Sequence, residues 1–318
     1  MGDRWILDAL DPDRRSRLEE GVALARTIAA AERSGTATDE QRASWSFLDA
    51  IAFAPLREAV GLDALRLAVS GAAPLPPELH EWFLAVGIPL SEIYGQSESS
   101  GPISWSPHEA RPGPVGRAIP ECEVRLADDG EVCCRGPNVF RGCWHDEART
   151  SDALVDGWLH TGDIGVLEPD GLLRIVDRKK DLIVTSVGEH VSPASLEAAL
   201  RMVPLIGQAV VVGDGRPFVA AVVTLDPDAV RNSAASHDLV DRTTATLVEE
   251  PALVADVAAG IDGLNERLVP PSQVRRFAIV TEDWDRTAGL LTPTAKLKRR
   301  AVAERYADVI DGLYRTVP

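Results

Sequence analysis

The sequence is short of several features, and each scarcity excludes a class of protein. No run approaches the roughly 18 apolar residues that a membrane-spanning helix needs, so we expect no transmembrane segment. The first residues, MGDRWILDALDPDRR, lack the apolar core of a secretory signal peptide. Lysine and arginine number 33 against 49 acidic residues. The resulting net charge of −16 argues against a general nucleic-acid-binding protein, which needs a broad basic surface.

Cysteine is also scarce and is confined to one part of the chain. The four cysteines are Cys122, Cys133, Cys134 and Cys143, and they show no Cys-x-x-Cys spacing. A zinc site and a disulfide scaffold are therefore both disfavoured. We expect reduced, partly buried thiols in a cytoplasmic protein. A peripheral contact with a membrane stays open, because such a contact needs no spanning helix.

What the sequence does contain is typical of a soluble globular protein. Its 318 residues suffice for about two domains, and 45% apolar with 26% charged residues is an ordinary balance. Apolar residues at helical spacing predict a helix over 14–31, whereas the polar residues 32–43 predict a loop. Within this loop, SGTAT lacks the Gly and Lys of a phosphate-binding loop, so a linker is favoured.

The next segments predict a layer of strands and helices. Leu65–Val69 alternates like a strand, and Leu90–Tyr94 follows as a second strand. Between them, Pro76 and Pro77 open a helix that Gly87 closes. This order predicts an α/β fold with ligand contacts at the carboxyl ends of the strands.

Hairpins and then a mixed region are expected farther along, so the fold class is α/β and in part α+β. Asp-Asp-Gly at 128–130 and Pro-Asp-Gly at 169–171 mark hairpin turns. Ser192 is predicted to cap a helix that has Pro193 in its first turn. Further expected elements are strands at 209–212, 218–225 and 276–280, helical segments to about Leu268, and a terminal helix from about Leu297. We place the two domains at 1–178 and 179–318.

The stretch DGWLHTGDIGVLEPDGLLRIVDRKKDLI, residues 156–183, is the most informative part of the chain. Asp163 presents a carboxylate beside Gly162, whose missing side chain lets a ligand approach the backbone. A carboxylate in such a turn can accept both hydroxyls of a ribose. Arg178, on the far side of the hairpin, suits a phosphate or ribose oxygen. The alternative is a surface hairpin with a solvated charge run, and spacing alone does not decide between them.

Four segments in order carry a family resemblance. They are SGAAPLPPEL (70–79), YGQSESSG (94–101), DGWLHTGDIG through DRKKD (156–181) and LTPTAKLKRR (291–300). Together they resemble the adenylate-forming, AMP-binding superfamily of acyl-CoA synthetases, luciferases and peptide-synthetase adenylation domains. IVDRKKDLI and LTPTAKLK look most like the long-chain fatty acyl-CoA synthetase branch. The resemblance extends from about residue 44 to the C-terminus.

The resemblance implies a fold and a reaction. Residues 1–178 resemble the C-terminal portion of the family's large AMP-binding domain, and 179–318 resemble its small mobile α+β domain. The implied enzyme is a long-chain fatty acid–CoA ligase, in which a fatty acid attacks ATP to give acyl-adenylate and pyrophosphate. The thiol of coenzyme A then displaces AMP to give the thioester. ATP, AMP, Mg²⁺, coenzyme A and a fatty acid are thus the implied ligands.

On the same basis, several residues acquire roles in nucleotide binding. The small side chains at 71–74 leave room for a purine, Tyr94 stacks on adenine, and Ser97 donates to the α-phosphate. Glu98 is the implied magnesium ligand and a catalytic residue, since Mg²⁺ prefers hard oxygen ligands. The alternatives are an ordinary strand-to-helix turn at 71–74 and a solvated acid at Glu98. The implied nucleotide-binding residues in this part of the chain are Gly71, Ala72, Ala73, Pro74, Tyr94, Gly95, Gln96, Ser97 and Ile175.

The C-terminal motifs complete the implied site, in which Asp163 and Arg178 keep the roles argued above. Lys180 matches the hinge about which the family's small domain swings between the two half-reactions. Gly188 matches the loop that lines the pantetheine channel. Lys296 matches the catalytic lysine, whose ammonium group stabilises negative charge on the attacking and phosphoryl oxygens. The alternatives are a solubilising charge at Lys180 and a basic helix start at Lys296.

The chain departs from the family's pattern in what precedes these motifs. It has no Ser/Thr/Gly-rich phosphate loop ending in Pro-Lys-Gly, nor the long segment that completes the large domain. One hypothesis is an N-terminally truncated synthetase whose missing half is supplied by another chain or was lost to a wrong start site. The other is an inactive remnant or interaction module that keeps the fold without adenylating activity. Ancestry favours the first, and for the activity of this chain alone we favour the second.

Overall fold

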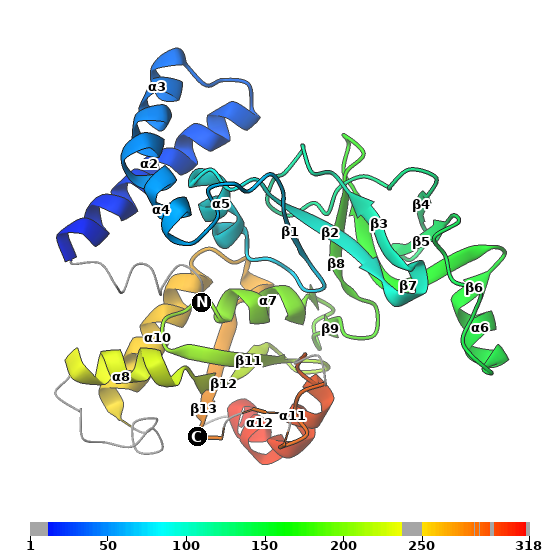
Figure 1. Ribbon diagram of the computed structural model, residues 1–318. Coiled ribbons are helices and arrows are strands. Elements are labelled where there is room, and N and C mark those ends of the chain that lie inside the picture. The colour runs from blue at the N-terminus through cyan, green and yellow to red at the C-terminus, as the bar shows by residue number, and fades with distance from the viewer. Residues whose placement is uncertain (1–11, 237–249, 283, 286, 293–295, 316–318) are drawn as a thin grey trace. The chain divides into compact units, whose positions relative to one another are not determined.

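The chain divides into two compact units (Figure 1). The computed structural model describes residues 12–236, 250–282, 284–285, 287–292 and 296–315. The N-terminal unit comprises Met1–Thr161 and Gly165–Ile175, and the C-terminal unit comprises Gly162–Ile164 and Val176–Pro318. The middle of one strand therefore belongs to the second unit. The domain boundary expected between 178 and 179 stays a prediction.

The N-terminal unit begins with helical elements that share one buried cluster. These elements are α2 (Pro12–Arg33), α3 (Asp39–Leu48), a π-helical turn (Asp49–Phe53), α4 (Ala54–Ala59) and α5 (Pro77–Ala85). Val22 and Ala25 of α2 are buried with Phe53 and with Trp82 and Ala85 of α5. The helix expected over 14–31 is confirmed, because its apolar positions form this buried face.

The loop expected over 32–43 is wrong in its second part, because α3 begins at Asp39. The Thr38 hydroxyl accepts the backbone N–H of Gln41 at 3.2 Å, and the Gln41 side chain accepts the N–H of Thr38 at 2.9 Å. This reciprocal capping box satisfies two N–H groups at the helix start. Residues 39–43 therefore form the first turns of a helix, whereas SGTAT at 34–38 links α2 to α3 as expected.

A three-stranded sheet holds the first two motifs. It contains β1 (Ala68–Gly71), β2 (Leu90–Gln96) and β3 (Gly101–Trp105), in the order β1-β2-β3. β1 and β2 run parallel, with α5 as the crossover between them, so the predicted strand–helix–strand unit is confirmed. β2 and β3 run antiparallel, and their register shifts between Tyr94 and Gly95.

The second sheet contains the predicted hairpins. Its strands are β4 (Glu123–Leu126), β5 (Glu131–Arg135), β6 (Leu154–Val155), β7 (Trp158–Leu167) and β8 (Leu173–Arg178), and α6 (Glu147–Ala153) precedes β6. The order is β4-β5-β7-β6, with β8 also paired to β7. The expected turns at 128–130 and 169–171 connect β4 to β5 and β7 to β8. The four cysteines are free, as expected, and burial raises the pKa of Cys134 to about 12.

The C-terminal unit is built on another three-stranded sheet. Its elements are β9 (Ile183–Val184), β10 (His190–Val191), α7 (Pro193–Leu200), β11 (Ile206–Val212), β12 (Val219–Leu225), α8 (Pro227–Ser236), α10 (Pro251–Asn265), a 3-10 turn (Pro270–Ser272), β13 (Val274–Val280), α11 (Arg299–Arg305) and α12 (Ala307–Tyr314). β11 pairs antiparallel with β12, and β12 pairs parallel with β13. The predicted cap of α7 is confirmed, because the Ser192 hydroxyl accepts the N–H of Ser195 at 3.3 Å.

Helices cover both faces of this sheet (Figure 1). Val211 and Val223 pack in the cluster that includes residues of α7 and α10, whereas Val210 and Val222 pack with residues of α11 and α12. The alternation follows the two-residue period of a strand. It explains why β11 and β12 are nearly continuous apolar runs.

The expected terminal helix needs one correction. It begins at Arg299 rather than Leu297, and Tyr306 interrupts it with φ −105° and ψ 25° before α12 begins. Leu297 instead forms a β-bridge with Leu291. The described residues include no helix with the length and apolarity that crossing a bilayer requires.

Candidate active site

A hollow of about 390 Å³ lies where β1 and β2 end, in the N-terminal unit. We call it the strand-end hollow. Two of the predicted motifs meet in it. The strands β1 and β2 run parallel, so the motifs that follow them lie at the same end of the sheet. Its lining residues are Ala72, Ile93, Gly95, Gln96, Ser97, Gly101 and Pro102.

Gly95 allows β2 and β3 to approach each other closely beside the hollow. A Cβ atom at this position would lie 2.0 Å from the carbonyl oxygen of Gly101 and 2.8 Å from the Cα atom of Pro102. Both are backbone atoms, so no side-chain rotation could relieve the contact. Glycine is therefore required where β2 meets β3, and bare backbone faces the hollow.

A 3-10 turn at Ser97–Ser99 follows β2 and holds the polar groups of the motif. The N–H of Gln96 donates to the Ser99 hydroxyl at 3.0 Å, and the N–H of Phe140 donates to the carbonyl oxygen of Glu98 at 2.8 Å. These bonds fix the backbone of the turn. Ser97 is exposed and lines the hollow, and Glu98, its half-buried neighbour, is not among the lining residues.

The predicted magnesium ligand is a single carboxylate. Within the described part of the chain, no group of three or more His, Cys, Asp or Glu residues could hold a metal ion. Mg²⁺ is commonly held by one or two carboxylates together with substrate phosphates. Glu98 fits that pattern only when a nucleotide supplies the remaining oxygens.

The other predicted residues of the N-terminal unit lie outside the lining of the hollow. Gly71, Ala73 and Pro74 are exposed in and after β1. The ring of Tyr94 packs against buried side chains of the β-sheet core, and Ile175 packs against one of the same clusters. Tyr94 is thus partly buried against the core, and its stacking on adenine stays a prediction.

Asp163 and Arg178 meet in the C-terminal unit. The Nε atom of Arg178 lies 3.2 Å from Oδ1 of Asp163, and their side chains are 51% and 8% exposed, respectively. The N–H of Lys179 donates to the carbonyl oxygen of Gly162 at 2.8 Å, which fixes the two segments next to each other. The structure brings the predicted pair together as an ion pair. A ribose bound to Asp163 would share its carboxylate with Arg178.

Two turns carry the predicted hinge and the predicted coenzyme A contact. Lys180 is exposed in a turn after β8, in which the N–H of Asp181 donates to the carbonyl oxygen of Arg178 at 2.9 Å. Gly188 lies in the β9–β10 hairpin with φ +84°, a left-handed conformation that favours glycine. Its N–H donates to the carbonyl oxygen of Thr185 at 2.9 Å. Both assigned roles stay predictions.

Lys296 lies exposed before α11, and we call the described residues 290–292 and 296–298 the lysine loop. The N–H of Thr292 donates to the carbonyl oxygen of Lys296 at 2.7 Å, and the N–H of Lys296 donates to the Thr292 hydroxyl at 2.9 Å. At the base, the N–H of Lys298 donates to the carbonyl oxygen of Leu290 at 2.8 Å. The backbone of the predicted catalytic lysine is therefore fixed by its own loop.

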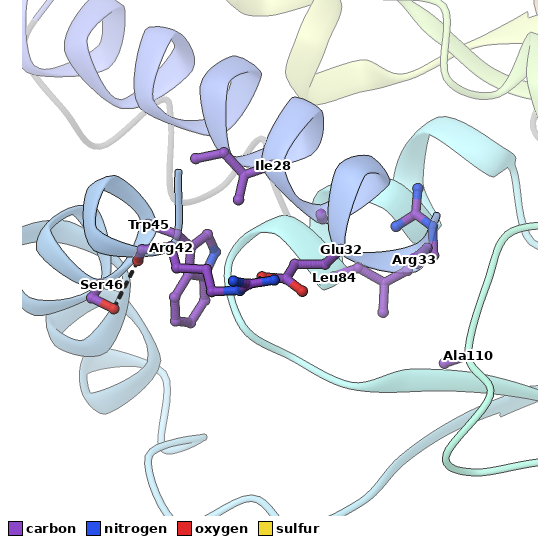
Figure 2. Close-up of a pocket in the computed structure, with 9 residues that line it drawn as sticks. Ile28, Glu32, Arg33, Arg42, Trp45, Ser46, Leu84 and Ala110 are labelled. Atoms are coloured by element: carbon purple, nitrogen blue, oxygen red, sulfur yellow. Dashed lines mark hydrogen bonds and ion pairs between the residues drawn. The ribbon is translucent and has the colours of Figure 1, made fainter. Parts of the chain in front are cut away.

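A second cavity, of about 380 Å³, contains none of the predicted site residues. It lies among α2, α3 and α5, and its walls include Ile28, Trp45 and Leu84 (Figure 2). Arg42 and Glu32 form an ion pair in it, with Nε 2.7 Å from Oε1. A second arginine, Arg33, also lines this cavity.

The sequence did not indicate three of the residues that line the hollow, nor one long-range ion pair. Ile93, Gly101 and Pro102 line the strand-end hollow, but Gly-Pro is typical of a turn and concealed the start of β3. Arg299 binds Glu197 in the C-terminal unit, 102 residues away along the chain. No local pattern signals a contact across such a separation.

Comparison with known proteins identifies the family. The AMP-binding enzyme family matches residues 23–144, and the AMP-binding enzyme C-terminal domain matches residues 180–318. The chain belongs to the AMP-binding enzyme family. The resemblance of its motifs to this adenylate-forming family is confirmed.

Two relatives are long-chain-fatty-acid–CoA ligases by name. The chain is 40% identical over 275 residues to the long-chain-fatty-acid–CoA ligase FadD15 of Mycobacterium bovis, an overlap of 86% of this chain and 46% of FadD15. It is 36% identical over 292 residues to the long-chain-fatty-acid–CoA ligase ACSBG1 of Bos taurus, with 84% and 40% of the two chains covered. The chain thus spans about half the length, or less, of these relatives.

Solved structures of the family share the fold. The A-PCP didomain of carboxylic acid reductase from Segniliparus rugosus, in complex with AMP, matches with a TM-score of 0.62 at 24% identity, covering 92% of this chain and 40% of that one. O-succinylbenzoate coenzyme A synthetase (MenE) from Bacillus subtilis, in complex with ATP and magnesium ion, matches with a TM-score of 0.54 at 25% identity. That match covers 73% of this chain and 45% of MenE. The expected mixed α/β fold is confirmed.

Proposed function

We propose that this chain carries the nucleotide and lysine sites of an AMP-forming long-chain fatty acid–CoA ligase. The observation that carries the proposal is the strand-end hollow, which joins Ala72 to Gly95, Gln96 and Ser97. Ligands of open α/β sheets bind outside such strand ends. The names of FadD15 and ACSBG1 supply the substrate class.

In this proposal the adenine and the α-phosphate of ATP occupy the hollow. A flat ring lies against the bare backbone at Gly95, and the Ser97 hydroxyl donates to an α-phosphate oxygen. In the C-terminal unit, Asp163 keeps its proposed role of accepting ribose hydroxyls, and Arg178, its ion-pair partner, that of contacting ribose or phosphate oxygens. Glu98 would hold Mg²⁺ with the phosphates, and the ion would neutralise their charge.

The chemistry that these residues support is largely electrostatic. The fatty-acid carboxylate attacks the α-phosphorus, and pyrophosphate leaves with its negative charge. The ammonium group of Lys296 stabilises this charge, a contribution that is largest in a water-poor site. In the second step the thiol of coenzyme A attacks the acyl carbonyl and AMP leaves. Lys180 is the hinge between the steps, and Gly188 lets the pantetheine arm approach its hairpin closely.

We also propose that a second polypeptide completes the large domain. β1 supports the proposal because it lies at the edge of its sheet, with Val69 and neighbouring Leu67 exposed at 45% and 42%. Exposed apolar edge strands favour pairing with another chain. The assembly would work in the cytoplasm, with peripheral membrane contact to collect its fatty acid.

A second candidate applies to the chain on its own: an interaction module that keeps the fold without adenylating. The exposed apolar edge at β1 favours it. Fatty-acid-dependent exchange of labelled pyrophosphate into ATP separates the two candidates. We expect little exchange by the purified chain and clear exchange once a polypeptide matching the other half of FadD15 is added. Robust exchange by the chain alone would remove the second candidate, and no exchange in the mixture would count against the first.

A further inference from the structure

A partly buried ion cluster in the C-terminal unit joins α11, the helix that follows the lysine loop, to α7. Arg299, the first residue of α11, donates from Nε to both Glu197 carboxylate oxygens at 2.8 and 3.0 Å. Its Nη2 atom donates to Oε2 at 2.8 Å. The side chains are 29% and 10% exposed. This forked geometry is specific to a guanidinium group, because an ammonium group cannot donate two parallel bonds from a rigid plane.

The cluster also reaches the segment that follows the predicted hinge. Nη1 of Arg299 donates to Oδ2 of Asp181 at 3.3 Å, and Asp181 is the next residue after Lys180. The Glu197 carboxylate additionally accepts the backbone N–H of Val211 in β11 at 3.1 Å. One arginine therefore connects α11, α7 and the residue beside the hinge. All these groups belong to the C-terminal unit.

The charges of the cluster reinforce one another. Burial raises the pKa of Glu197, although the nearby Arg299 opposes this. Burial also works against the charge on Arg299, but the Glu197 carboxylate outweighs it and raises the pKa of Arg299. Arg299 thus stays cationic, and its loss would take from the buried Glu197 carboxylate the cation that pairs with it, while the N–H of Val211 would still donate to it.

Arg299 stands at the base of the lysine loop. The loop closes through the Lys298 N–H bond to Leu290, whose side chain is only 3% exposed. Lys296 lies three residues before Arg299 in the sequence. The position of its backbone therefore depends on how rigidly Lys298 and Arg299 are attached to the rest of the unit. Backbone bonds join Thr292 to Lys296 and Leu290 to Lys298, and Arg299 connects this base to α7.

We propose that Arg299 is a positioning residue for Lys296. It ties the lysine loop to Glu197 and to Asp181, so that a movement of the segment beside Lys180 carries the lysine with it as part of one rigid body. The consequence for catalysis rests on the proposed function, whereas the positioning itself does not. A flexible loop would leave the ammonium group misplaced during adenylation, where a displacement of about 1 Å can cost roughly 100-fold in rate.

The test is amide hydrogen exchange of the full chain, comparing wild type with Arg299→Lys. This variant keeps the charge and loses the fork. We expect exchange in residues 290–298 to rise by about tenfold or more, with the exchange of β11 and β12 unchanged. Arg305→Lys is the matched control, because Arg305 forms a similar fork with Glu282 at the exposed end of the same helix. The control should leave the lysine loop as protected as in wild type.

Each outcome bears on the proposal. Unchanged exchange in 290–298 overturns it, and a rise of equal size throughout the C-terminal unit overturns it in favour of a purely structural role. In a reconstituted enzyme, Arg299→Lys should lower the kcat of adenylation without raising the KM for ATP, and a loss in KM alone would also contradict positioning. If the proposed function fails, the kinetic readout disappears while the exchange readout still decides the positioning.

Discussion

Gly95→Ala should distort the strand-end hollow and weaken AMP binding. The added Cβ would lie 2.0 Å from the Gly101 carbonyl oxygen, whereas ordinary contact begins at 3.4 Å. Because the opposing atoms are backbone, β2 and β3 must separate by more than about 1 Å to restore normal contact. The paired residues are Gly95 with Pro102 and Gln96 with Gly101, so the separation falls on the part of the ladder that lines the hollow.

The size of the effect of Gly95→Ala follows from these contacts. Overpacking of this kind costs about 1–3 kcal/mol. Each weakened ladder hydrogen bond adds about 1 kcal/mol. We therefore expect the N-terminal unit to lose about 2–4 kcal/mol of its free energy of unfolding. AMP affinity should fall by about tenfold or more, since 1.4 kcal/mol corresponds to a factor of about ten.

Two measurements check this prediction. Calorimetric titration with AMP gives the affinity, and hydrogen exchange of residues 90–105 reports the stability of the sheet. Gly21→Ala in α2 is the matched control, because the nearest atom to its added Cβ is 3.4 Å away, at the end of the Leu48 side chain. Alanine is favoured over glycine in helices by about 1 kcal/mol, so this control should not be destabilised. If Gly95→Ala matches wild type in both affinity and exchange, the reasoning about the hollow is refuted.

Three further predictions concern single side chains. In a reconstituted enzyme, Lys296→Ala should slow adenylation by about 100-fold or more. Thioester formation from preformed acyl-adenylate should keep its rate. Equal losses in both half-reactions would contradict the role of Lys296. Asp163→Ala should weaken ATP binding by about tenfold through lost ribose hydrogen bonds, and an unchanged Kd would count against the assignment. The side-chain hydrogen bond from Arg305 holds the pKa of Glu282 below 4.5, so this pair stabilises the fold above that pH and the stability is lost as the pH falls. The difference in Tm between neutral and acid pH should therefore be smaller for Glu282→Gln than for wild type, and an equal difference would contradict this.

Local signals in the sequence predicted the parts of the fold that local chemistry decides. Ser192 and Pro193 start α7 because a hydroxyl cap and a fixed φ satisfy the first turn without help from distant residues. The turn at 128–130 likewise depends only on neighbouring residues. The motifs at 70–74 and 94–97 could be expected to lie close together, because the carboxyl ends of neighbouring parallel strands lie at the same end of a sheet.

Features that depend on distant partners could not be predicted in this way. Tyr94 looks like a ligand-facing aromatic residue in its motif, yet its ring packs on side chains that come from later strands. The bond between Arg299 and Glu197 joins segments that no periodicity relates. Residues 162–164 group with the C-terminal unit although the rest of β7 belongs to the N-terminal unit, and no change of composition marks this division in the sequence.

The most direct test of the account is amide hydrogen exchange of the purified chain with and without saturating AMP. We expect protection in residues 92–102, which line or adjoin the strand-end hollow, and none in residues 42–48 beside the second cavity. Protection of the first segment alone would support the hollow as the nucleotide site of a fatty acid–CoA ligase. No protection in 92–102, or protection confined to the helices around Trp45, would contradict it.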